Sequence, residues 1–227
     1  MNESPAQVLE TLTSERHSCR AFLPQPVDRA TLESVLRMAQ RAASWCNSQA
    51  WQVSVLSGAA TERLREKLVA AARAGEGGAT DFPFPHDYQG VYLERRRDCG
   101  FRLYGAVGVE RGDRGGYAQQ TLENFRLFGA PHVAILTSDA GLGVYGAVDV
   151  GGYVQLVLLA MQAHGIAAIP QAALAHHGAL IKRELGIGPD RLMVCGISFG
   201  YEDTAHPANG FRTPRAPLAQ AVQFVDA

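Results

Sequence analysis

Arginines near both ends of the chain are the residues whose spacing first suggests chemistry. Arg16, Ser18 and Arg20 alternate, so an extended backbone would point all three to one side. The segment Phe211–Arg215 supplies two more guanidinium groups, Arg212 and Arg215. If the two ends meet, four arginines surround one anion, and a phosphate carried on a polar chain is the natural guest. Alternating charges also mark solvated surface segments, so the prediction depends on the two ends meeting.

A second polar segment runs from Ser44 to Trp51, between a predicted helix and a predicted strand. The amides of Asn47 and Gln49, in such a bend, can recognise a planar ring that carries several hydrogen-bond acceptors. A simple loop after a helix explains the same residues, and spacing alone favours that interpretation.

Two familiar motifs occur in surroundings that argue against their usual functions. Gly141–Gly146 matches the dinucleotide-binding pattern GxGxxG, but no acidic residue lies between Asp149 and Glu184, where a ribose contact is expected about 20 residues on. Gly196–Gly200 matches GxSxG, but no helix can follow Ser198 as a nucleophile elbow requires. We interpret the first as the entry to a core helix and the second as a closely packed strand end.

Metal and dithiol chemistry have little support in the sequence. The four cysteines form no CxxC pair, which argues against zinc ribbons and thioredoxin-type motifs. His176 and His177 are adjacent, and neighbouring helical side chains point about 100° apart, so the two rings do not converge on one metal. We expect these histidines at the surface or at a helix end.

Composition describes an ordinary globular protein. The 227 residues are 47% hydrophobic and 19% charged, and 21 basic residues nearly balance 22 acidic ones. No basic excess favours nucleic acid or a membrane surface. The apolar stretch 144–163 contains Asp149, Gln155 and Gln162, so we predict a buried core helix rather than a membrane span. The N-terminus lacks a signal-peptide pattern, so we expect a cytoplasmic protein.

Periodicity and local breaks predict one α+β domain over residues 1–227. The expected helices cover 5–15, 29–42, 61–75, 90–107, a segment ending at Phe128, 144–163 and 176–185. The expected strands cover 51–56, 133–137, 166–169, 192–197 and 222–225. Asp28 should cap the second helix, and Gly186 should end the last one.

A glycine- and proline-rich stretch at 75–88 interrupts this order and carries Phe82, Phe84 and Tyr88. Such a loop is typical of a mobile element or substrate cover. Local packing of an insertion at about 75–118 explains the same aromatic residues equally well.

Several of these segments together resemble the FMN-dependent nitroreductase family. The similarity runs in order along residues 16–216, through the segments 16–22, 44–51, 124–131, 165–172, 196–200 and 212–215. Ala50 departs from the family, which usually has proline before the tryptophan, and Trp45-Cys46 is bulkier than usual.

The resemblance implies a three-layer sandwich with a mostly antiparallel central sheet, built as an intertwined homodimer with FMN at the interface. Arg16 and Ser18 would bind the phosphate and ribityl chain, and Arg212 and Arg215 would close on the phosphate. Arg20 would lie beside N1 and O2 of the flavin, where a cation stabilises the reduced, anionic ring. The Asn47 segment would reach the partner's flavin, and the C-terminal strand would cross to the partner.

The remaining site residues also come from the resemblance. Asn124 and Arg126 are candidates for the pyrimidine edge, and the backbone of Pro170, Gln171 and Ala172 would pass the ring near N5. The cofactor set is completed by His17, Ser44, Cys46 and Gln49. No catalytic side chain or metal is expected, since the flavin carries the chemistry.

The implied activity is ping-pong transfer of two electrons from NADH or NADPH to a small aromatic acceptor, a nitroaromatic or a quinone. Three alternatives remain. The same scaffold could act as an oxidase, dehalogenase or ene reductase; it could bind flavin without turnover; or Ser198 could serve a hydrolase.

Overall fold

The computed structural model describes residues 4–226, and its centre is a four-stranded antiparallel sheet. The strand order is β1-β2-β4-β3, with β1 at Gln52–Ser57, β2 at His132–Asp139, β3 at Ala167–Gln171 and β4 at Arg191–Gly200. All three pairings are antiparallel, which confirms the predicted character of the sheet. The central strands β2 and β4 are buried along most of their length.

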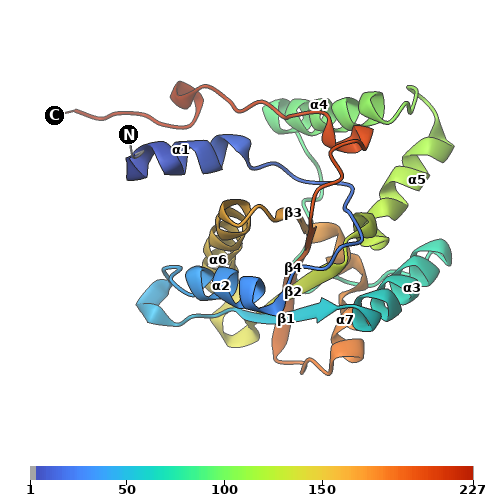
Figure 1. The fold of residues 1–227 in the computed structure, drawn as a ribbon, viewed down its shortest axis with the longest axis horizontal. Coiled ribbons are helices and arrows are strands. Elements are labelled where there is room, and N and C mark those ends of the chain that lie inside the picture. Colours follow the sequence, from blue (N-terminus) through green and yellow to red (C-terminus); the bar gives the residue numbers. More distant parts are fainter. Residues whose placement is uncertain (1–3, 227) are drawn as a thin grey trace.

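Helices cover both faces of this sheet (Figure 1). They are α1 (Pro5–Glu15), α2 (Arg29–Ala39), α3 (Ala59–Arg73), α4 (Gly90–Ala106), α5 (Arg114–Phe125), α6 (Gly143–Ala163) and α7 (Gly178–Leu185). Successive side chains of a strand face opposite ways. Ala134 and Leu136 of β2 therefore pack in a core with α2 and α6, whereas Val133 and Ile135 pack in a core with α3 and α7. The result is the three-layer α+β sandwich that the family resemblance implied.

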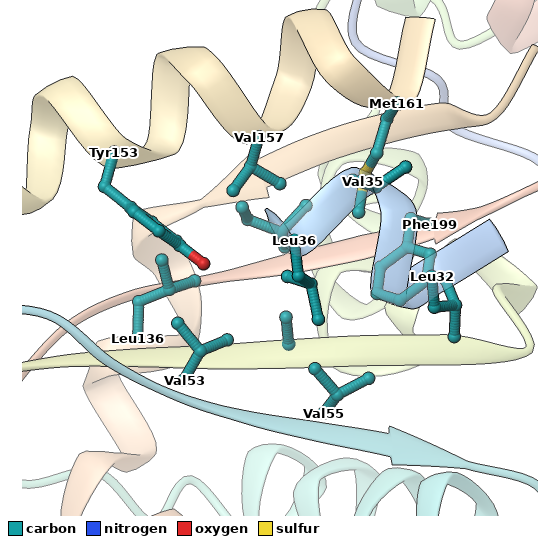
Figure 2. A pocket seen from close by; sticks show the side chains of 12 residues that line it. Leu32, Val35, Leu36, Val53, Val55, Leu136, Tyr153, Val157, Met161 and Phe199 are labelled. Carbon is teal, nitrogen blue, oxygen red and sulfur yellow. The ribbon is translucent and has the colours of Figure 1, made fainter. Parts of the chain in front are cut away.

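The core beneath α2 and α6 is closely filled. Figure 2 shows side chains of both helices pointing toward Val53 and Val55 of β1 and Leu136 of β2. The space between them is lined by apolar side chains and holds only about 10 Å³, roughly the room of one water molecule. This interior therefore stabilises the fold and has no room for a ligand.

Local sequence signals set several helix ends as predicted. Asp28 caps α2 by accepting a hydrogen bond from Thr31 N (2.9 Å), and Gly186 ends α7 in the left-handed conformation (φ 64°). The helix expected to end at Phe128 instead stops at Phe125, because Leu127 and Phe128 take left-handed backbone angles. The last helix begins at Gly178 rather than His176, after a 3₁₀ segment at Ala172–His177.

Two strand predictions need correction. β3 continues through Pro170 to Gln171, which an edge strand permits because one side of it needs no ladder partner. The strand expected at 222–225 does not form: this segment has no regular structure, and Phe224 and Val225 are 77% and 84% exposed. In Figure 1 the C-terminal tail extends away from the sheet, so it has no strand beside it within the described chain.

The long helix α6 is buried on one side only, contrary to the expectation that it runs through the core. Val150, Tyr153 and Val157 pack into the core, whereas Val144 and Val148 are 67% and 63% exposed. The stretch Ala140–Ala163 is long and apolar enough to cross a membrane (mean hydropathy 1.5), but its inner side packs against α2 and the sheet. Its outer side leaves an uncovered apolar surface.

The glycine-rich stretch before α4 contains no helix or strand, as predicted, but part of it is fixed to the body of the protein. The Asp81 carboxylate accepts hydrogen bonds from Lys182 Nζ and from Met193 N, both at 2.8 Å. Phe84 stacks on His176 with ring centroids 4.4 Å apart. The helix α4 and the first turn of α5 then occupy about half of the predicted insertion.

Candidate functional site

The two arginine-bearing ends of the chain meet beside the edge strand β3. Ser18 forms a parallel bridge with Ala168, and Cys19 N donates to Ala168 O (3.2 Å). Leu23 N donates to Tyr201 O (2.8 Å), just after the last strand of the sheet. The N-terminal segment is therefore held between β3 and the chain that leaves β4.

Asn209 completes this junction, and nothing in the sequence marked it. Its side chain is buried at 4% exposure, its Oδ1 accepts from Arg20 N (2.7 Å), and its Nδ2 donates to Ala21 O and Asp203 O (both 2.9 Å). All of its amide atoms are therefore engaged in joining residues 20–21 to residues 203–209. The surrounding Pro-Ala-Asn-Gly is an ordinary turn sequence, which explains why it gave no signal.

Four arginines line the cleft that this junction creates. Arg16, Arg20, Arg212 and Arg215 surround a space of about 270 Å³, which is also lined by Thr13, Ser14 and Ser18. No Asp or Glu lines the cleft, and within residues 4–226 none of these four arginines forms an ion pair. Uncompensated positive charge in a concave site favours an anionic guest.

Burial adds to this preference. The pKa of Arg16 is lowered by burial and then by the neighbouring charge of Arg215, which shows that the two ends of the chain feel each other's charge. Burial also lowers the pKa of Arg20. An anion bound in the cleft would favour the charged form of Arg16 and Arg20 and so oppose the lowering of their pKa, because no carboxylate of the protein lines the cleft.

The arginines are held in place mainly by backbone carbonyls and an aromatic ring. Arg20 donates to Ser18 O (3.1 Å) and lies over the Phe211 ring, 5.3 Å from its centroid. Arg212 donates to Asn209 O (2.7 Å), and Arg215 donates to Thr213 O (3.1 Å). Carbonyl acceptors orient the guanidiniums without neutralising them.

His17 and Cys99 also line the cleft, but neither contributes a free positive charge to it. His17 lines the cleft, but its Nε2 pairs with Glu202 (3.0 Å) and its Nδ1 lies 3.2 Å from Glu15 O, so its ring supports the backbone. Cys99 reaches the cleft from α4 and was not predicted. The insertion therefore contributes to the wall of the site.

The segment 44–49 lies outside this cleft and packs against the first turns of α6. Trp45, Cys46 and Ser48 line a separate space of about 330 Å³ with Tyr145 and Asp149. Asn47 and Gln49 are exposed, and neither lines the arginine cleft. Ser44 Oγ accepts from Gln49 N (3.0 Å) and so closes the loop on itself. Within one chain these predicted residues do not join the arginine cleft.

Asn124 and Gln171 contact each other rather than an open cleft. Gln171 is 3% exposed; its Nε2 donates to Asn124 O (2.9 Å), and its Oε1 accepts from Ser198 Oγ (2.5 Å). The side chain of Gln171 is thus committed to the fold, which leaves only the backbone of Pro170, Gln171 and Ala172 for a ligand.

Arg126 lies in another part of the structure. Its guanidinium pairs with Glu123 (2.6 Å) and lines a shallow cleft shared with Arg65. It is not among the residues that line the four-arginine cleft. The pairing follows from helical spacing, since residues three apart lie on one face.

The two familiar motifs have structural explanations. Ser198 is fully buried in β4, and a Cβ on Gly196 would lie 2.5 Å from Leu174 Cδ1, so this segment is a closely packed strand. A Cβ on Gly146 would lie 2.3 Å from Ser138 Oγ, so that glycine lets α6 approach β2. Among residues 4–226, no group of three or more His, Cys, Asp or Glu side chains is placed to hold a metal ion.

Fold and cleft together define an α+β protein with a cationic cleft beside the edge of its sheet, suited in charge to a phosphorylated or otherwise anionic ligand. The chain belongs to the nitroreductase family, whose model matches residues 13–201.

Individual relatives agree with this assignment. The chain is 43% identical over 220 residues to nitroreductase NfnB of Mycolicibacterium smegmatis, covering 96% of this chain and 93% of that protein. It is 32% identical over 206 residues to a 4-nitrobenzoate reductase of Pseudomonas putida, covering 91% and 90%. Its fold matches the crystal structure of the FMN-dependent nitroreductase NfnB from Mycobacterium smegmatis in complex with NADPH, with a TM-score of 0.94, 41% identity and coverage of 98% and 100%.

Proposed function

We propose that this protein is an FMN-dependent NAD(P)H oxidoreductase that reduces nitroaromatic or quinone-like acceptors by a ping-pong mechanism. The observation that carries the proposal is the cleft in which four arginines from opposite ends of the chain meet with no carboxylate among them. Relatives that are FMN- and NADPH-dependent nitroreductases and nitrobenzoate reductases support the same chemistry.

The cleft fits the tail of FMN in charge and in donor type. Arg16, Arg212 and Arg215 would hold the phosphate, and the Ser18 hydroxyl would meet the ribityl chain. The space of about 270 Å³ suits a phosphate with its polar chain rather than the whole cofactor, so the ring would extend beyond it along β3. There the backbone of 170–172 would line its path.

Bound FMN would supply hydride acceptance at N5 and delivery of two electrons to an acceptor. The chain's own contribution is to orient and to tune. Arg20, fixed by Ser18 O and the Phe211 ring, would place a cation beside N1 and O2. Arg126 is paired with Glu123 in another cleft, so we no longer place it at the pyrimidine edge.

The second half of the site would come from a partner copy of this chain. Asn47, Cys46 and Gln49 are exposed on a loop beside the uncovered apolar side of α6, which carries Val144 and Val148. Exposed apolar surface of this kind is typical of a subunit interface. A homodimer would cover it and would bring the 44–49 loop to the partner's flavin.

The C-terminal tail supports the same arrangement. Leu218, Phe224 and Val225 are 65%, 77% and 84% exposed, and β1 and β3 are the edge strands of the sheet. Residues 222–225 are rich in strand-forming side chains, but they join no strand within residues 4–226. We propose that they cross to the other subunit, which makes the dimer intertwined.

The insertion at 75–118 would form one wall of the cleft that holds the flavin phosphate, within a single domain spanning 1–227. Cys99 of α4 reaches the arginine cleft, and Arg95 donates to Gln220 (3.0 Å), so α4 lies against the C-terminal tail. The four cysteines are unpaired, which agrees with a reducing cytoplasm.

A visible spectrum of the purified protein tests the proposal directly. We expect a yellow protein with the flavin bands of bound FMN, bleached without oxygen by NADPH or NADH and restored by 4-nitrobenzoate. A colourless protein that takes up no added FMN would overturn the assignment. Flavin that stays oxidised under both nucleotides would instead identify a binding protein without turnover.

A further inference from the structure

The loop at 44–49 holds an unusual backbone conformation. Cys46, Asn47 and Gln49 all have positive φ angles, of 50°, 55° and 49°. Residues other than glycine seldom take these angles, and a cluster of them persists only where surrounding contacts hold it. The loop therefore needs an anchor outside itself.

A buried carboxylate on α6 supplies that anchor. Asp149 is 9% exposed; its Oδ1 accepts from Trp45 N (3.1 Å), and its Oδ2 accepts from Trp45 N (3.3 Å) and Ser48 Oγ (3.0 Å). The two donors lie on either side of Cys46 and Asn47. One side chain thus holds both flanks of the left-handed pair.

The position of Asp149 is itself fixed by close packing. Gly146 lies one turn earlier on the same helix, and a Cβ there would lie 2.3 Å from Ser138 Oγ of β2. The far end of the loop is also held, since Arg191, 8% exposed, donates to Ala50 O (2.9 Å). Contacts with α6 and with β4 therefore fix the position of the 44–49 loop on the body of the protein.

We propose that Asp149 is a positioning residue, which holds the 44–49 loop so that Asn47 and Trp45 face the flavin and acceptor site of the partner subunit. The role of the loop at the partner's flavin rests on the proposed function, whereas the hydrogen bonds of Asp149 to the loop do not. The indole of Trp45 is 60% exposed and packs edge-on against Tyr145, with centroids 4.5 Å apart, so it offers an aromatic wall to a flat acceptor. Asp149 acts through hydrogen bonds and does not itself touch the ligand.

The loop can be followed without any cofactor, because the chain has only two tryptophans, Trp45 and Trp51. In a Trp51→Phe background Trp45 is the only indole. We expect Asp149→Ala to lower the fluorescence anisotropy of Trp45 and to increase its quenching by acrylamide at least about twofold. Ser48→Ala removes one contact only and should give a smaller change in the same direction.

Turnover provides the second readout, with the complete FMN-loaded protein. We expect Asp149→Ala to raise the KM for 4-nitrobenzoate about tenfold while kcat changes less than about threefold, since misplacing a binding wall weakens capture more than chemistry. Asp149→Asn keeps an oxygen for Trp45 N and an amide for the Ser48 hydroxyl, so it should stay within about threefold of the unchanged protein.

Asp28 offers a matched control because it accepts the same pair of donors, a backbone N–H and a hydroxyl, from Thr31 (2.9 and 2.6 Å). Asp28→Ala should lower thermal stability but leave the Trp45 signal and the acceptor KM unchanged. Equal Trp45 anisotropy in Asp149→Ala and the unchanged protein would overturn the inference, as would an Asp149→Asn variant that behaves like Asp149→Ala. Failure of the unchanged protein to bind FMN would overturn the proposed function and leave the Trp45 result standing.

Discussion

The side-chain oxygen of Asn209 accepts a hydrogen bond from the backbone N–H of Arg20 at 2.7 Å, joining positions 189 residues apart. The same amide donates to Ala21 O and Asp203 O. One buried side chain therefore ties the N-terminal arginine segment to the C-terminal one.

Asn209→Ala should loosen the cleft and destabilise the protein. Loss of the amide leaves Arg20 N without its acceptor, at a cost of about 1–3 kcal/mol for an unsatisfied group, while Ala21 O and Asp203 O each lose one donor but keep Asp203 N and His206 N. Urea unfolding should show this loss, and FMN titration should show weaker binding. Asn209→Asp keeps the acceptor for Arg20 N but turns a carboxylate oxygen toward the carbonyl oxygens of Ala21 and Asp203, so it should also be less stable than the unchanged protein. An Asn209→Ala protein as stable as the parent would contradict the role of this junction.

Arg16→Ala and Arg215→Ala should each weaken FMN binding. A charge-assisted contact of about 1.5–3 kcal/mol corresponds to roughly a 10- to 150-fold loss of affinity. Fluorescence titration of the apoprotein with FMN measures this change directly. Arg29→Ala is the control, because Arg29 is exposed and pairs with Glu33 on α2. Unchanged affinity in both cleft variants would refute the phosphate role.

Arg20→Ala should lower the two-electron midpoint potential of the bound flavin. The guanidinium would stabilise negative charge at N1 and O2, and a contact of about 1.5–3 kcal/mol equals roughly 30–65 mV for two electrons. Equilibration with a redox dye of known potential gives the value. Arg20→Lys retains the positive charge, so it should lower the midpoint potential less than Arg20→Ala does. A potential that stays constant or rises in Arg20→Ala would place this arginine elsewhere on the ligand.

His132 should make stability fall as the solution becomes acidic. It is 1% exposed; Val27 N donates to its Nε2 (2.9 Å), so Nδ1 carries the proton and faces Ser57 Oγ (2.7 Å). Burial lowers the pKa of His132, so the folded state binds fewer protons than the unfolded chain. This contribution is fully present above about pH 6.5 and is lost as the pH falls toward the folded value, by at most about 1.4 kcal/mol per pH unit.

Urea unfolding between pH 5 and pH 8 tests the His132 effect. His132→Gln should be less stable at pH 8 and should show a flatter dependence on pH. Burial and the charge of His176 also lower the pKa of His177, which adds a dependence of the same sign. His177→Gln serves as the comparison, and an unchanged slope in His132→Gln would exclude His132 as the main source.

Much of the fold follows from local sequence signals. The ends of α2 and α7 depend on Asp28 and Gly186, which act within one turn and can be read without tertiary information. The predicted anion site required the two ends of the chain to meet, and the structure brings Arg16 and Arg215 into one cleft. Family resemblance supplied the roles that spacing alone left open.

Other features depend on contacts that no local pattern reveals. Asp149 looked like an interruption of an apolar helix, yet it holds a loop about 100 residues earlier in the chain. The backbone at Leu127 and Phe128 turns left-handed, which a helical pattern does not foresee. The sequence of 222–225 predicts a strand, but the described residues 4–226 pair no strand with it, so the prediction and the structure differ.

Completion of the arginine cleft by residues 209–215 has a consequence for biosynthesis. The ribosome makes Arg16 and Arg20 long before Arg212 and Arg215, so a nascent chain carries only half of its anion receptor until the second pair has been made. Cofactor loading should therefore wait until residues 209–215 have been made, and a stop codon shortly before Asn209 should yield a polypeptide that contains all four strands of the sheet yet captures no flavin.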